Sequence, residues 1–105
     1  MPADRISALE GMLEGRPEDT RLRFGLALEY LRVGRIDDGV RELRRYLAAS
    51  EDEGNAWGRL GAVLLEQGRD DEAREAYLTG IDAARRHGHP TMAQEFEEVL
   101  ESLDP

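Results

Sequence analysis

Apolar residues recur three or four positions apart along most of this chain, in runs that glycine-containing breaks separate. This spacing places them on one face of an α-helix, and no stretch alternates at period two as a half-buried strand would. The breaks contain glycine, and two of them also contain proline; both residue types interrupt helices. The pattern predicts an all-α protein of six helices. They lie near residues 4–14, 19–33, 37–49, 54–67, 71–86 and 90–103.

A longer period runs through the middle of the chain, where nine positions from Leu22 to Leu47 are answered 34 residues later. The pairs are Leu22 and Ala56, Leu26 and Leu60, Ala27 and Gly61, Leu31 and Leu65, Gly34 and Gly68, Asp37 and Asp71, Asp38 and Glu72, Leu43 and Tyr77, and Leu47 and Ile81. A fixed period of this length indicates stacked helical units, none of which buries its apolar face alone.

The second copy of the period carries Trp57, then Leu60-Gly61, Ala73 and Tyr77 at a characteristic spacing. In these residues the chain resembles the tetratricopeptide repeat family. The first copy keeps the register but departs at Arg23, Ala27, Gly39, Leu43 and Glu51, and the second at Arg85, where the family has its closing Pro. The resemblance implies an α-solenoid of antiparallel helix pairs.

The same period organises the ends of the predicted single domain. Projected backward, it aligns Ile6 and Leu13 with the second helix of a repeat; projected forward, it puts Glu95 and Glu98 at core positions, so the strict repeat ends there. A polar outer side is typical of a terminal cap. We therefore divide 1–105 into an N-terminal half-repeat helix (4–17), repeat one (20–53), repeat two (54–87) and a C-terminal capping helix (88–105).

The resemblance also implies a concave groove lined by the first helix of each repeat. The expected apolar lining is Phe24, Leu28, Leu31, Ala62 and Leu65, and the expected polar rim is Arg21, Arg32, Asn55, Arg59 and Glu66. Such a groove suits a helical or extended peptide segment. The predicted function is a non-enzymatic protein–protein interaction module or scaffold.

Two alternatives stay open at this point. The stripe Phe24, Leu28 and Leu31 would instead be core if the terminal helix covers it, and a homodimer through the same surface satisfies both readings. Gly58 and Ala62 leave a dip in the lining that favours something inserting there. In the capping helix, Phe96 belongs to the lining if that helix keeps register.

Charge and composition narrow the partners. Every one of the fourteen basic residues is Arg, but the formal net charge is −9, and this negative charge argues against nucleic acid as a partner. Residues 20–50 carry seven Arg against four acids, whereas 87–105 carry five acids and no Arg. No Cys, signal-peptide pattern or membrane-length apolar run is present, so a cytoplasmic protein is expected.

Residues with catalytic or metal-binding potential are few. His87 and His89 flank a Gly-Pro break and are expected to be solvated loop histidines. The acidic runs 51–53 and 70–72 fit a turn and a helix start, and neither resembles a calcium loop. The residues that clamp chaperone tails in some tetratricopeptide domains are absent, since Phe24, Leu28 and Arg59 stand in their places. No cofactor and no catalytic residue is predicted.

Overall fold

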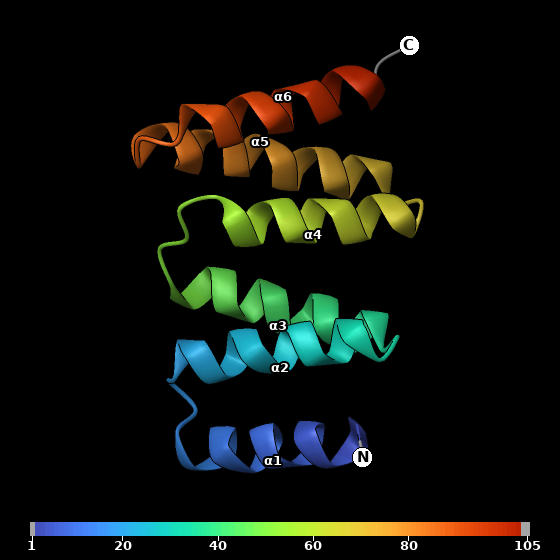
Figure 1. Cartoon of the computed structure of the whole chain (residues 1–105), viewed down its shortest axis with the longest axis vertical. Helices are drawn as coiled ribbons and strands as arrows, with labels where there is room; N and C mark the ends of the chain where they lie inside the picture. Colours follow the sequence, from blue (N-terminus) through green and yellow to red (C-terminus); the bar gives the residue numbers. More distant parts are fainter. Residues whose placement is uncertain (1, 104–105) are drawn as a thin grey trace. The chain divides into compact units, whose positions relative to one another are not determined.

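The computed structural model describes residues 2–103, with side chains from residue 5 onward. It contains six helices and, within that range, no strand (Figure 1). They are α1 (Pro2–Gly15), α2 (Thr20–Arg32), α3 (Ile36–Ala49), α4 (Asn55–Glu66), α5 (Asp70–Arg86) and α6 (Pro90–Leu103). The predicted all-α fold is confirmed, with every boundary within two residues. The helices fall into two compact units, Met1–Ser50 with α1 to α3 and Glu51–Pro105 with α4 to α6.

Local chemistry fixes where the helices begin and end. The Asp19 carboxylate accepts a hydrogen bond from the backbone N–H of Leu22 at 3.1 Å and caps α2. Gly34, Gly68 and Gly88 follow α2, α4 and α5 with φ of 85°, 73° and 77°. Only glycine adopts this left-handed conformation without strain, so it ends the helix and turns the chain back.

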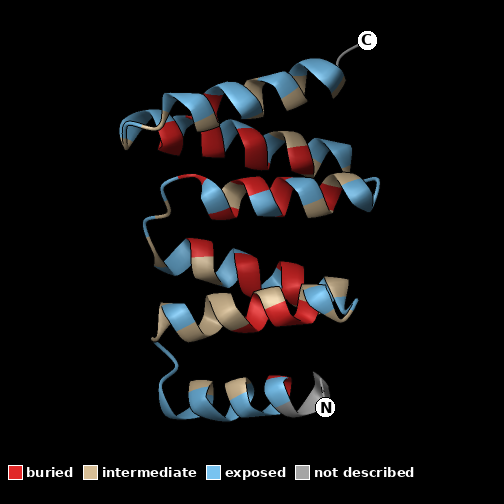
Figure 2. Ribbon diagram, viewed as in Figure 1, coloured by how far each residue is buried: buried red, intermediate tan, exposed pale blue. Residues whose placement is uncertain are grey.

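In the first unit, the core lies where α2 packs between α1 and α3. Ile6, Leu26 and Tyr30 are buried together. On the other side of α2, Leu43 is fully buried and Leu31 packs over Gly39, where a Cβ atom would lie 2.7 Å from the Leu31 Cγ. Gly39 thus lets α3 approach α2 closely. Figure 2 shows buried residues on both α2 and α3.

In the second unit, the family motif forms the contact between α4 and α5. Leu60 and Leu64 are fully buried, and the Tyr77 ring lies against Gly61, where a Cβ atom would be 2.6 Å from the Tyr77 Cε2. The buried Ile81 and the half-buried Leu100 belong to a cluster that joins α5 to α6. No helix within residues 2–103 has the length and apolarity needed to cross a membrane.

Candidate protein-interaction surfaces

On α2, the predicted lining residues share one face. Phe24, Leu28 and Leu31 are half-buried there, whereas Leu26 is 3% and Ala27 0% exposed. The Phe24 ring packs on Tyr46 of α3, with ring centroids 4.8 Å apart. The face is therefore partly covered by α3 and partly accessible.

The two arginines predicted at the rim of this face differ in their ion pairs. Arg21 and Arg32 are both exposed. The Arg32 guanidinium bonds to the Glu29 carboxylate, which lowers the pKa of Glu29, and Arg5 of α1 adds a contact to the same carboxylate at 3.3 Å. Arg21 makes no hydrogen bond or ion pair with any residue the structure describes. Arg21 can therefore contact an external carboxylate without first breaking an internal pair.

On α4, the other half of the predicted set also shares one helix. Asn55, Arg59, Ala62 and Glu66 are exposed, and Leu65 is half-buried. Within the described residues Arg59, like Arg21, has no ion pair. The structure thus gathers five of the ten predicted residues on α2 and five on α4. One groove shared by both helices stays a prediction.

The dip predicted at Gly58 is already filled by the chain itself. A Cβ atom at Gly58 would lie 2.5 Å from the Phe96 Cζ, so the ring of the α6 residue occupies that space. The sequence places Phe96 in the lining only if the last helix keeps the repeat register; in the structure Phe96 is half-buried, with its ring against Gly58 of α4 and Gly80 of α5. The missing side chain of Gly58 is compensated within the molecule.

Sequence reasoning missed a polar cluster in the first unit. The Glu42 side chain of α3 is only 4% exposed and accepts hydrogen bonds from Arg23 at 2.6 Å, Arg41 at 3.1 Å and Arg45 at 3.0 Å. In the sequence, the only feature that points to this cluster is the set of arginines on either side of Glu42. The same pattern is equally typical of a solvent-exposed helix face.

The buried Tyr30 extends this cluster toward α1. Its hydroxyl donates to the Glu10 carboxylate at 2.6 Å, and Arg35 lies over its ring, 4.6 Å from the centroid. Burial, helped by the bond to Glu10, raises the pKa of Tyr30 to about 12. Tyr30 and Glu10, together with Arg41 and Arg45, line a pocket of about 310 Å³. Its wall on α1 is acidic, and its wall on α3 carries the two arginines.

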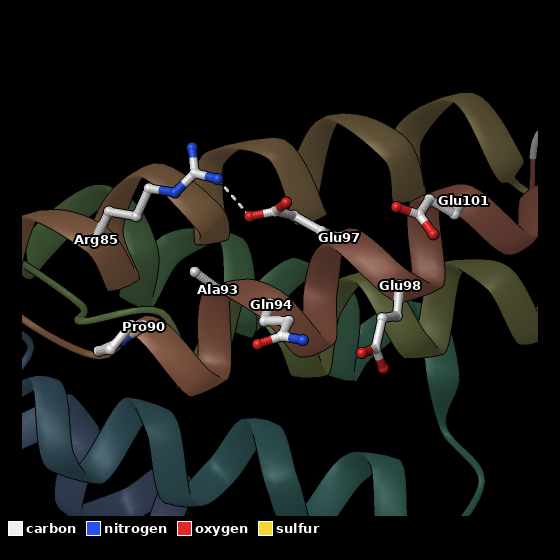
Figure 3. A pocket seen from close by; sticks show the side chains of 7 residues that line it. All are labelled: Arg85, Pro90, Ala93, Gln94, Glu97, Glu98 and Glu101. Atoms are coloured by element: carbon white, nitrogen blue, oxygen red, sulfur yellow. Dashed lines mark hydrogen bonds and ion pairs between the residues drawn. The ribbon is translucent and has the colours of Figure 1, made fainter.

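In the second unit, an acidic pocket of about 570 Å³ lies over α5 and α6 (Figure 3). Its lining residues are Arg85, Pro90, Ala93, Gln94, Glu97, Glu98 and Glu101. Figure 3 shows the Arg85 guanidinium of α5 reaching the Glu97 carboxylate of α6. This ion pair links α6 to α5 at the protein surface.

The two histidines differ from the expectation of solvated loop residues. The His89 Nε2 lies 2.6 Å from the Glu53 Oε1, and this hydrogen bond lowers the pKa of Glu53. His87 is half-buried, and its Nε2 has no hydrogen-bond partner among the residues that the structure describes. Among residues 2–103 no group of three or more His, Cys, Asp or Glu side chains is placed to hold a metal ion. His89 instead joins the α5–α6 turn to the segment before α4.

Comparisons with known proteins agree with this architecture. The tetratricopeptide repeat family profile matches residues 24–88. The chain is 30% identical over 99 residues to the TPR repeat-containing protein PA0015 of Pseudomonas aeruginosa, covering 94% of each. The crystal structure of MamA superposes with a TM-score of 0.67 at 19% identity, over 95% of this chain and 67% of MamA, and supports the fold alone. Domains of this type generally mediate protein–protein interactions, typically without catalysis, so protein partners are implied in general. The chain belongs to the tetratricopeptide repeat family.

Proposed function

We propose that this chain is a non-enzymatic module that binds a helical or extended segment of another protein. Each unit offers one contact surface: the apolar face of α2 beside Arg21 in the first, and the apolar face of α4 beside Arg59 in the second. The observation that carries the proposal is on α2, where three large apolar side chains remain half-exposed next to an arginine that has no ion pair with any described residue.

The chemistry of the α2 face indicates what kind of segment would bind there. Phe24, Leu28 and Leu31 are spaced as one helical stripe, so apolar anchors at regular spacing on the partner match them. A guanidinium without an internal partner contributes most when it meets a carboxylate in bidentate geometry. The expected segment therefore has apolar anchors and at least one acidic side chain.

Site-specific photocrosslinking tests the proposal. The photoreactive residue p-benzoylphenylalanine replaces Leu28 in one variant, Leu65 in a second and the exposed Leu78 of α5 in a control. We expect Leu28 and Leu65 to capture the same protein from an extract of the source organism, and Leu78 not to capture it. Capture by all three positions alike would contradict the proposal.

The captured segment is then synthesised and its affinity measured. Arg21→Glu places a like charge against the acidic partner and should weaken binding by about tenfold. Arg86→Glu, on α5, is the control for the same change of charge at another exposed position. Equal effects of the two substitutions would remove Arg21 from the site.

A homodimer through the α2 face is the second candidate. The half-exposed Phe24, Leu28 and Leu31 favour it as much as they favour an external segment. In that case Leu28 crosslinks to a second copy in the purified protein, before any extract is added.

A further inference from the structure

The repeat register reveals how each unit fills one particular space beside its helix pair. Phe24 and Tyr46 stack in the first unit, with centroids 4.8 Å apart. One period later, the corresponding positions are Gly58 and Gly80. The second unit therefore lacks both rings that fill this space in the first.

Phe96 of α6 supplies the missing aromatic group. A Cβ atom at Gly58 would lie 2.5 Å from its Cζ, and a Cβ atom at Gly80 would lie 3.1 Å from its Cε2. Tyr77 closes the space with an edge-on contact, 5.4 Å between centroids. We name Gly58, Gly80 and Tyr77 the aromatic socket.

Phe96 lies on α6, a helix with few buried residues. Among the described residues of α6 only Ala93 is buried, and Phe96 is half-buried. Figure 2 shows most of α6 in the colours of exposed and half-buried residues. A short turn, 87–89, connects α6 to α5. Helices with few buried contacts open locally more readily than the core does.

We propose that the aromatic socket is an exchangeable binding site for an aromatic anchor on an amphipathic helix, and that α6 of a second copy is its occupant in trans. The α6 helix of a second copy fits the socket because its sequence is identical. Its Phe96 would pack against Gly58 and Gly80, and its Glu97 would pair with Arg85, as they do within one chain. Exchanging an identical element between copies is a low-cost route to a dimer.

A labelled synthetic peptide of residues 88–105 serves as the probe, titrated with full-length protein. When the peptide binds the wild-type protein, it replaces an identical helix, so the complex gains no contact. When it binds Phe96→Ala, its own Phe96 ring fills a socket that the variant leaves empty. We therefore expect the peptide to bind Phe96→Ala at least about tenfold more tightly than it binds the wild type, on the scale of burying a large apolar side chain. A peptide that carries Phe96→Ala should show no such gain.

Glycine substitutions in the Phe96→Ala background supply the matched controls. Gly58→Ala puts a methyl group where the incoming ring must lie, so it should abolish the tenfold gain without crowding the folded protein. Gly25→Ala, on α2, has no atom within 4 Å of the added Cβ and should leave the gain intact. Both are helical Gly→Ala changes, so a general effect on helix stability affects them alike.

Two results would overturn the proposal: equal affinity of wild type and Phe96→Ala for the peptide, or equal effects of Gly58→Ala and Gly25→Ala. The socket does not include the α2 face. Failure of peptide binding together with successful crosslinking from Leu28 would therefore reject the socket and leave the proposed function standing.

Discussion

At the scale of single residues, glycines set how closely aromatic rings approach the backbone. Gly61 has no side chain where the Tyr77 ring packs, and Gly58 has none where Phe96 packs. Gly25 and Gly11, by contrast, have no neighbouring atom within 4 Å of an added Cβ. The first pair is required by packing, and the second pair is not.

Gly61→Ala should therefore destabilise the protein. The added methyl group overlaps a buried ring, and crowding of this kind costs about 1–3 kcal/mol of the free energy of unfolding. Urea denaturation followed by circular dichroism measures the change. Gly25→Ala is the control and should raise stability slightly, by about 0.5–1 kcal/mol, because alanine favours the helix. A Gly61→Ala protein as stable as Gly25→Ala would show that the Tyr77 contact is not tight.

The pair of Glu53 and His89 predicts a pH dependence. The hydrogen bond from His89 lowers the pKa of Glu53 below its unfolded value of 4.5, so as the pH falls below that value the unfolded chain binds more protons there than the folded chain does. Stability from this group is thus present above the unfolded pKa and is lost as the pH falls through the lower, folded pKa. In Glu53→Gln, unfolding free energy should rise less steeply from about pH 3 to 5.5 than in the wild type.

Glu51→Gln, in the same loop, is the control for removing a surface carboxylate. Its profile should follow the wild type, since Glu51 forms no ion pair within residues 2–103. Parallel profiles for Glu53→Gln and the wild type would mean that the His89 contact does not persist in solution.

At the scale of elements, a buried carboxylate ties α2 to α3. Arg23 of α2 is 16% exposed and bonds to Glu42, which also accepts from Arg41 and Arg45 on its own helix. A buried ion pair adds little over apolar packing, but removing one partner leaves a desolvated charge. The cluster therefore constrains which residues α3 tolerates more than it adds to stability.

Glu42→Gln tests this constraint. It keeps the side-chain shape but leaves Arg23 without a buried counter-charge, so we expect a loss of about 2–4 kcal/mol in unfolding free energy. Glu66→Gln, on an exposed face of α4, should change it by less than about 0.5 kcal/mol. Thermal or urea unfolding distinguishes the two. A similar small change for both would show that water reaches Arg23 in the variant.

The sequence predicts elements well here because helix signals are local. The caps at Asp19 and Gly34 and the 34-residue period set helix boundaries and pairing before any tertiary contact is known. The burial of Glu42 is not predictable in this way, since it depends on Arg23 arriving from another helix. The place of Phe96 depends likewise on two glycines of different helices. A missing side chain in the sequence does not reveal which residue fills the space.

At the scale of the whole molecule, two modes of self-association predict different behaviour. A dimer through the α2 face forms by surface contact, so it should dissociate promptly on dilution and disappear in Phe24→Asp. A dimer that exchanges α6 needs Phe96 to leave its socket in both copies. It should therefore persist after dilution, be unaffected by Phe24→Asp, and relax at least about tenfold faster in Phe96→Ala, where the ring no longer resists opening.

Light scattering on protein concentrated and then diluted follows this relaxation directly. Because exchange replaces each contact with an identical one, Phe96→Ala should alter the relaxation rate much more than the final proportion of dimer. Prompt dissociation that Phe96→Ala leaves unchanged would exclude exchange of α6. If Phe24→Asp also abolishes that dimer, the α2 face is the self-association surface, and it is then open to an external segment only when the protein is monomeric.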